Sequence, residues 1–297
     1  MAEKNKEFVF ETDEETIEAS LDEVKKMADA GDPDGLYALG MAYLFGMGIE
    51  QNTEKGFELL ESASEKGQPY AMTLLVEMFM SHKYTGMNAQ KAVEYSMIGA
   101  EAGIDDAQLF LGIAYKDGVG VKRDYKKAAE LFRESAKQGN SEARNSLAYI
   151  YQEGLGVEKD ISKAFKLYKN AAAAGNINAQ YQVGAYYEDG IGVKKDLKKA
   201  AEWYVKAAEQ GDTFAMERLG IVYLIGSYEL PRDPISSFEW FLEAALGGML
   251  GAMHHVGLFY IEGFGVEKDE EEGMKWLRLA ASSGSEESKD VLSRLEK

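Results

Sequence analysis

Residues 117–132, DGVGVKRDYKKAAELF, decide the fold of this chain because their pattern recurs along the sequence. Gly118 and Gly120, followed by Lys122 and Arg123, could form either a loop that holds a phosphate or a joint between two helices. The glycine pair occurs five times, as Gly46/Gly48, Gly118/Gly120, Gly154/Gly156, Gly190/Gly192 and Gly263/Gly265. Five identical nucleotide sites in one chain are implausible, and the spacings of a P-loop or a dinucleotide loop are absent. The pattern therefore favours the joint.

The joint belongs to a module of 36 residues. Residues 107–139, 143–175 and 179–211 align without gaps. An aromatic column keeps the register through seven modules, as Tyr43, Phe79, Tyr115, Tyr151, Tyr187, Tyr223 and Tyr260. A regular period of this length is the mark of a repeat architecture.

Each module is expected to fold as helix, short loop, helix. Ala107, Leu111 and Tyr115 recur at four-residue steps and form one apolar stripe, and Ala128, Leu131 and Phe132 form another after the loop. Small residues in fixed columns let neighbouring helices approach closely. We expect the larger residue in the column of Leu131, a tryptophan in the last three modules, to fill the core between them.

The residues of the joint have predictable roles. The first glycine should end a helix in the left-handed conformation, and the second should allow the tight reversal. The N-cap of the next helix is expected to be an Asp or Asn, at Asn52, Asn88, Asp124, Asp160, Asp196, Asp233 and Asp269. Lys127, Lys163 and Lys199 fall in a first helical turn, where the helix dipole disfavours cations, and only the apolar surface covered by their stems accounts for them.

Composition narrows the possible functions. The chain has no cysteine, which excludes thiolate chemistry and disulfides. Its net charge of −18 disfavours nucleic acid and anionic lipid as partners. The sequence shows neither a secretory leader nor an apolar run long enough to span a bilayer, so we expect a cytoplasmic protein without membrane insertion.

The columns A-x3-L-G-x2-Y-x2-G-x-G-V-x2-D-x2-K-A resemble the SEL-one-like repeat family, which is related to the tetratricopeptide repeat, and the match covers nearly the whole chain. The resemblance implies an all-α, right-handed α-α superhelix, or solenoid, of about seven repeats. It also implies a scaffold or adaptor for other proteins.

The expected organisation is one solenoid domain over residues 13–297 after a flexible N-terminus over residues 1–12. Capping helices are expected within residues 13–31 and 285–297, because a terminal repeat must cover its exposed apolar face. The seven repeats are expected at about residues 34–67, 68–103, 104–139, 140–175, 176–211, 212–248 and 249–284.

The resemblance also implies a partner-binding groove on the concave face, which the first helix of each repeat lines. The tetratricopeptide pattern then points to Tyr37, Met41, Leu44, Leu109, Ile113, Asn145, Tyr149, Gln152, Tyr181, Glu188, Glu217, Ile221 and Leu224. Such a groove suits a protein or peptide with apolar anchors and some basic residues, in a regulatory or signalling assembly. Some of these side chains are equally expected to pack between adjacent first helices.

Nothing in the sequence indicates catalysis, a metal site or a cofactor. Only His82, His254 and His255 supply imidazoles, and adjacent histidines cannot face one way on a helix. Two alternatives stay open. One is an enzyme like the family members linked to β-lactam hydrolysis, although the S-x-x-K motif is missing. The other is a self-assembling structural element, and homo-oligomers are possible.

Two repeats lack the standard joint, in the loops at residues 81–90 and 226–234, and the second of these is one residue longer than the others. Such loops either carry an individual function or have degenerated without consequence.

Overall fold

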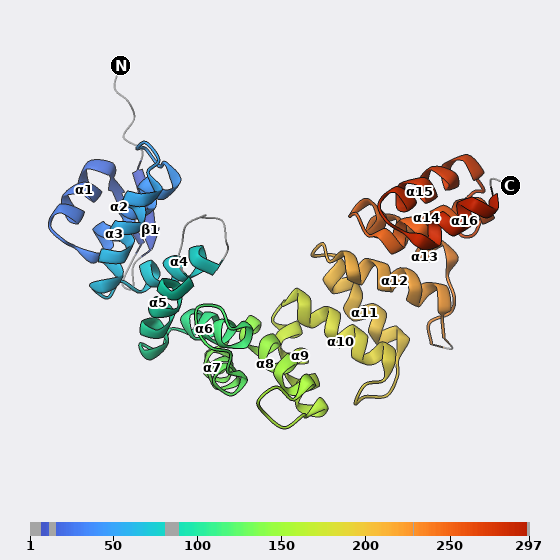
Figure 1. The fold of residues 1–297 in the computed structure, drawn as a ribbon, viewed down its shortest axis with the longest axis horizontal. Helices are drawn as coiled ribbons and strands as arrows, with labels where there is room; N and C mark the ends of the chain where they lie inside the picture. The colour runs from blue at the N-terminus through green and yellow to red at the C-terminus, as the bar shows by residue number, and fades with distance from the viewer. Residues whose placement is uncertain (1–6, 12–15, 81–88, 228, 296–297) are drawn as a thin grey trace, which may run out of the picture. The chain divides into compact units, whose positions relative to one another are not determined.

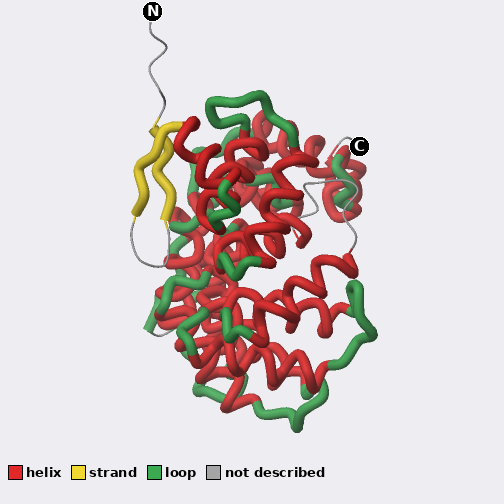
Figure 2. Tube along the Cα trace, turned by 90° about the vertical axis from the view of Figure 1, so that its left-hand side faces the viewer, coloured by secondary structure: helices red, strands yellow, loops and turns green. Residues whose placement is uncertain are grey.

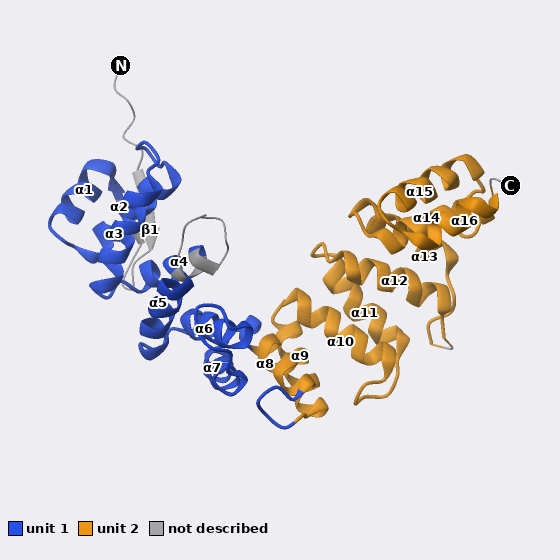
Figure 3. Ribbon diagram, in the orientation of Figure 1, with its two compact units in different colours: residues 1–143, 154–158 blue, residues 144–153, 159–297 orange. Residues whose placement is uncertain are grey.

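The computed structural model describes residues 7–11, 16–80, 89–227 and 229–295. These residues form a two-stranded sheet followed by a succession of helices (Figure 1, Figure 2). The predicted all-α fold of helix-loop-helix repeats is confirmed for the helical part. The chain divides into two compact units, which Figure 3 shows in different colours.

Unit 1 comprises residues 1–143 and 154–158. Each second helix packs against the first helix of its own repeat and, within this unit, against the next first helix. Its elements are β1 (Glu7–Glu11), β2 (Thr16–Ser20), α1 (Leu21–Asp29), α2 (Pro33–Phe45), α3 (Thr53–Glu65), α4 (Pro69–Met80), α5 (Ala89–Glu101), α6 (Asp105–Asp117) and α7 (Tyr125–Lys137).

Unit 2 comprises residues 144–153 and 159–297. The same pairing continues from α9 to α15, and α16 packs on α15 at the C-terminal end. Its elements are α8 (Ser141–Glu153), α9 (Ile161–Ala173), α10 (Ile177–Asp189), α11 (Leu197–Ala208), α12 (Thr213–Ile225), α13 (Pro234–Leu246), α14 (Leu250–Glu262), α15 (Glu270–Ser282) and α16 (Glu286–Leu295). The single domain expected over residues 13–297 stays a prediction.

The joint has the predicted geometry. Gly118 ends α6 in the left-handed conformation, with φ of 75°, and Gly120 follows with φ of 69°. The Asp124 carboxylate then accepts hydrogen bonds from the backbone amides of Lys126 and Lys127. The same capping contact is made by Asn52, Asp160, Asp196, Asp233 and Asp269. Asn88 lies outside the described residues.

The structure explains the lysines in the first turn of the second helices. The ammonium group of Lys163 lies 4.0 Å from the centroid of the Tyr151 ring and donates a 2.7 Å hydrogen bond to the Tyr151 hydroxyl. A cation over an aromatic face is attracted by the ring quadrupole, which offsets the unfavourable dipole. The arrangement recurs with Lys55 over Tyr43, Lys127 over Tyr115 and Lys199 over Tyr187.

The fully buried column of the second helices lies one residue after the column that the sequence predicts. Phe132 is buried against Gly112, where a Cβ would meet its ring at 2.6 Å. Leu131 and the tryptophans are only partly buried. The buried residues of this column are Leu60, Ser96, Phe132, Tyr168, Tyr204, Phe241 and Leu277. A glycine of the first helix makes room for the large side chain in five repeats, at Gly40, Gly112, Gly184, Gly220 and Gly257.

The N-terminal region differs from the prediction of a flexible segment and a helix. Residues 7–11 and 16–20 pair as an antiparallel hairpin, with Glu7 opposite Ser20. Both segments contain β-branched or aromatic residues, which favour strands. The helix begins only at Leu21 because Ser20 and Glu23 form a capping box.

Candidate functional site

The candidate interaction surface lies on the first helices of unit 2, α8, α10 and α12. We call it the first-helix face and define it by the predicted residues Asn145, Tyr149, Gln152, Tyr181, Glu188, Glu217, Ile221 and Leu224. Tyr149 is its most open aromatic residue, with 44% of its surface exposed. The other members are partly buried, except Glu188, which is buried.

Glu188 forms the charged centre of this face. It is only 5% exposed, and it pairs with the Arg218 guanidinium through both carboxylate oxygens. The Tyr204 hydroxyl donates a 2.7 Å hydrogen bond to Glu188 Oε2. The cluster joins α10, α11 and α12, so Glu188 ties neighbouring repeats together. Arg218 falls outside the tetratricopeptide pattern, and the sequence offers no signal for it beyond its charge.

Other members of the face make contacts within their own repeat or with a neighbouring one. The Tyr186 hydroxyl donates a 3.0 Å hydrogen bond to Gln152 Oε1. The Tyr181 ring lies 5.5 Å from that of Tyr204. Ile221 and Leu224 pack against the apolar cluster that contains Phe241. Several side chains of the face are therefore engaged in contacts with neighbouring helices of the fold, and the role of this face in binding a partner stays a prediction.

Two members of the first-helix face, Glu217 and Asn145, carry polar groups in partly buried surroundings. Burial raises the pKa of the Glu217 carboxyl, and the nearby Arg218 opposes that rise. Asn145 Oδ1 is buried and accepts no hydrogen bond within the described part of the chain. The partly buried Glu217 carboxylate could accept hydrogen bonds from a ligand with donor groups, whereas Asn145 Oδ1 is closed to a ligand in this structure.

The predicted residues of unit 1 divide into two groups. Leu44 and Leu109 are buried, so neither offers surface to a partner. Leu44 packs beside Gly56 of α3, which explains its burial. Tyr37, Met41 and Ile113 are partly buried, and the Tyr37 ring lies 6.3 Å from that of Tyr70.

The two adjacent histidines serve packing. His254 Nδ1 lies 2.8 Å from the Ser288 hydroxyl of α16, and the His255 ring stacks on Phe241 with centroids 4.4 Å apart. Burial lowers the pKa of both imidazoles. Among the described residues, no cluster of histidine and carboxylate side chains is arranged to hold a metal ion. His82 lies outside them.

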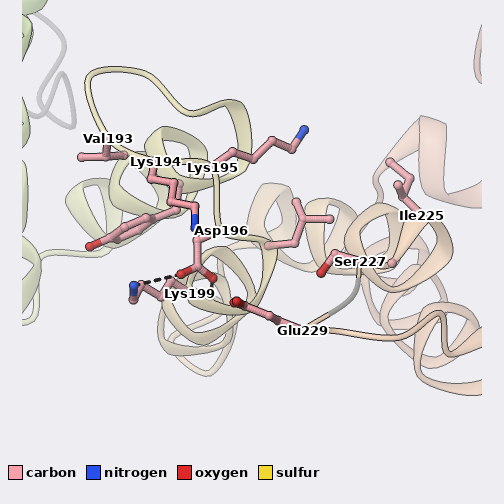
Figure 4. Close-up of a pocket in the computed structure, with 11 residues that line it drawn as sticks. Val193, Lys194, Lys195, Asp196, Lys199, Ile225, Ser227 and Glu229 are labelled. Carbon is pink, nitrogen blue, oxygen red and sulfur yellow. Dashed lines mark hydrogen bonds and ion pairs between the residues drawn. The ribbon is translucent and has the colours of Figure 1, made fainter.

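The loop of the sixth repeat departs from the standard joint, and a hollow of about 820 Å³ opens beside it. Figure 4 shows its two sides. The loop after α10 supplies Val193, Lys194, Lys195 and Asp196, and the end of α12 with the next loop supplies Ile225, Ser227 and Glu229. The other atypical loop, at residues 81–90, falls almost wholly outside the described residues.

A second hollow, of about 660 Å³, lies on the surface of α11. Its lining includes Trp203, Tyr223 and Leu230, and the Lys206 ammonium lies 4.1 Å from the centroid of the Trp203 ring. The partial exposure of Trp203 follows from its place in this wall.

No helix in the described ranges is long and apolar enough to cross a bilayer.

Helix pairs that repeat every 36 residues around a glycine joint define a helical repeat protein. The sequence model of the Sel1 repeat matches residues 33–68, 105–140, 141–176, 177–212, 213–249 and 251–285. The chain belongs to the Sel1 repeat family, whose members are generally scaffolds for protein interactions. The repeat built from α4 and α5 is not among the matched segments.

Two solved structures are similar over most of the chain. One is a protective antigen of uropathogenic Escherichia coli strains that displays an SLR fold, with 29% identity, a TM-score of 0.80, and coverage of 93% of this chain and 59% of the antigen. The other is a Sel1 repeat protein from Oxalobacter formigenes, with 29% identity, a TM-score of 0.76, and coverage of 92% of this chain and 78% of that one. The match to the antigen thus spans less than two thirds of the antigen's length.

Proposed function

We propose that this protein is a non-catalytic scaffold or adaptor that binds a partner peptide or helix on the first-helix face of unit 2, in a regulatory or signalling assembly. The observation that carries the proposal is Tyr149, an aromatic side chain 44% exposed on a first helix. Exposed tyrosines beside apolar residues are typical anchor points in protein interfaces. The cytoplasmic location expected from the sequence stays a prediction.

The chemistry of the face suggests the partner. Tyr149 and the partly buried Tyr181, Ile221 and Leu224 suit apolar anchors. The Glu217 carboxyl favours a basic or hydrogen-bond-donating residue beside them. Glu188 is already neutralised by Arg218 and contributes through packing.

Photo-crosslinking tests the location of binding. We would place p-benzoylphenylalanine at position 149 in the intact protein and irradiate it in an extract of its host cells. The control places the same group at position 279, because Leu279 is similarly exposed, at 47%, but lies on the second helix of the last repeat. We expect a discrete adduct from position 149 that is absent from position 279.

The captured partner then allows a quantitative test. Tyr149→Ala should weaken its binding about tenfold, as is typical for a central aromatic anchor, whereas Leu279→Ala should leave it unchanged. Identical adducts from both positions, or unchanged affinity after Tyr149→Ala, would refute the first-helix face as the binding surface.

A further inference from the structure

The standard joint reverses the direction of its own chain and also packs against the preceding repeat. In four of the five glycine joints, the second glycine lies against the start of the second helix in the repeat before it. A Cβ on Gly120 would lie 2.5 Å from the carbonyl oxygen of Ala89, and one on Gly156 would lie 2.7 Å from the amide nitrogen of Lys126. The same contact links Gly192 to Ile161 and Gly265 to Pro234.

The sixth repeat breaks this rule. Its loop, residues 226–232, is one residue longer and has no second glycine. Gly226 packs instead against Arg232 of its own loop, and Arg232 Nε donates a 2.7 Å hydrogen bond to the Leu224 carbonyl. Leu230 turns toward the apolar cluster around Tyr204. No second glycine therefore packs against the start of α11, where Leu197 is only 7% exposed, and the 820 Å³ hollow opens beside it.

The lining of this hollow combines positive charge with apolar surface. Lys194, Lys195 and Lys199 line it, against the carboxylates of Asp196 and Glu229. Asp196 caps α11 and pairs with Lys199 at 2.8 Å, so both of these groups are engaged, and Lys194 and Lys195 supply the positive charge for a partner. On the opposite side Ile225 exposes 59% of its surface (Figure 4). Exposure of such an apolar side chain beside a hollow is typical of a contact surface.

Charge indicates the occupant. The chain carries a net charge of −18, yet residues 194–199, KKDLKK, place four lysines around one aspartate. This local positive charge attracts acidic groups and repels basic ones. A partner that suits both sides of the hollow has carboxylates for the lysines and one apolar side chain for Ile225.

We propose that the hollow beside the loop of the sixth repeat is a second docking site, separate from the first-helix face, for an acidic peptide segment that packs an apolar side chain on Ile225. In this proposal the missing second glycine leaves room for the site, since in the neighbouring repeats Gly192 and Gly265 pack against the starts of α9 and α13.

The third repeat supplies a matched control. Its residues 122–127, KRDYKK, carry the same charges in the same places, but Gly156 covers the start of α7. The probe is a fluorescein-labelled peptide, Glu-Glu-Leu-Glu-Glu, and its affinity for the full chain is measured by fluorescence anisotropy. Lys194→Ala with Lys195→Ala should weaken binding about tenfold, whereas Lys122→Ala with Arg123→Ala should leave it nearly unchanged.

The apolar side is tested separately. Ile225→Ser should weaken binding of this probe, and it should have no effect on Glu-Glu-Gly-Glu-Glu, which lacks the apolar side chain. Equal losses in the two double lysine variants would show diffuse charge attraction and overturn the proposal. No binding of the leucine-containing probe to the unmodified chain would overturn it as well.

A loop exchange tests the geometric cause. Residues 227–232 are replaced by Leu-Gly-Val-Glu-Lys, the sequence of residues 155–159, which restores the second glycine without changing net charge. We expect loss of probe binding with a circular dichroism spectrum and a thermal midpoint at least equal to those of the unmodified protein. Full binding by the folded exchange variant would contradict the proposal.

Discussion

Glu188 shows how a single buried charge can join repeats. Its carboxylate lies between Arg218 of the next repeat and the Tyr204 hydroxyl, so all of its partners are fixed by the fold. Removing one member of a buried ion pair is costly because the other is left without compensation. Breaking the pair is therefore strongly destabilising, although the intact pair contributes little net stability.

We expect Arg218→Met to destabilise the protein by about 3 kcal/mol, because the Glu188 carboxylate then stays buried without its counterion. Adding Glu188→Gln should restore most of the loss, since the amide oxygen can still accept from Tyr204. Guanidinium unfolding of the single and double variants measures both. A double variant less stable than Arg218→Met would refute this account.

His255 makes stability depend on pH. Burial, followed by the charge of His254, lowers its pKa below the ordinary value of 6.5. As pH falls through 6.5, the unfolded chain takes up the proton first, so the stability from this residue is lost between 6.5 and the lower folded-state pKa. At pH 7.5 it is fully present.

His255→Phe keeps a ring against Phe241 and removes this titration. The drop in thermal midpoint between pH 7.5 and pH 5.5 should accordingly be smaller in the variant than in the unmodified protein. The carboxylates contribute equally to both proteins, which makes the difference specific to His255. The same drop in both would assign the pH dependence to other groups.

At the scale of the element, the two glycines of the joint have different roles. Gly118 and Gly120 have similar left-handed backbones, with φ of 75° and 69°. A Cβ on Gly118 would find room 3.4 Å from the nearest side chain, whereas one on Gly120 would collide with the Ala89 backbone. The first glycine serves the turn, and the second serves contact between repeats as well.

Alanine at these positions separates the two roles. Gly118→Ala should cost about 1 kcal/mol from backbone strain alone. Gly120→Ala should cost about 1–3 kcal/mol more, because the Cβ also forces α5 away. Denaturant midpoints of the two variants provide the comparison, and equal losses would show that the contact with Ala89 yields without cost.

Elements defined within one repeat could be predicted from the sequence. The period placed the helix pairs, and the left-handed glycines and the Asp124-type caps follow from local backbone chemistry. The buried column was placed one residue too early, because Leu131 and Phe132 both lie near the apolar stripe and only the position of Gly112 chooses between them. The lysine–tyrosine pairs and the Glu188–Arg218 pair join separate helices, so neither spacing nor propensity reveals them.

The candidate sites could likewise be predicted only in part. The sequence pointed to Tyr149 as a surface residue, and it pointed equally to Leu44 and Leu109, which are buried. The sequence marked the loop at residues 226–234 as unusual but did not indicate a hollow. The hollow depends on a contact between repeats, because the sixth repeat has no second glycine to pack against the second helix of the fifth. The paired strands at residues 7–11 and 16–20 were missed because they lie outside the repeat.

At the scale of the whole molecule, the main feature is a large net negative charge. The chain has 51 acidic and 33 basic residues, for a net charge of −18. Mutual repulsion of like charges destabilises a folded chain and is weakened by salt. The basic clusters at residues 122–127 and 194–199 are local exceptions within this acidic background.

Raising sodium chloride from 20 to 150 mM at pH 7 should raise the thermal midpoint by about 2 °C, as expected for a gain below about 1 kcal/mol in a chain of this size. Differential scanning calorimetry gives the comparison. Sodium sulfate at equal ionic strength separates screening from specific chloride binding, and a midpoint that falls with salt would show that attractive ion pairs outweigh the repulsion.

The cover that each joint provides for the preceding repeat determines where this protein can be lengthened. A 36-residue cassette inserted after Gly175 would receive a joint above its own second helix from the repeat that follows, and would supply one to the repeat before. A cassette inserted after Gly211 would meet a neighbour without that glycine and would inherit the hollow. Copies of the fourth repeat can therefore be inserted after Gly175 with all of their contacts between repeats retained. A repeat inserted after Gly211 would instead lie next to the sixth repeat and acquire the hollow.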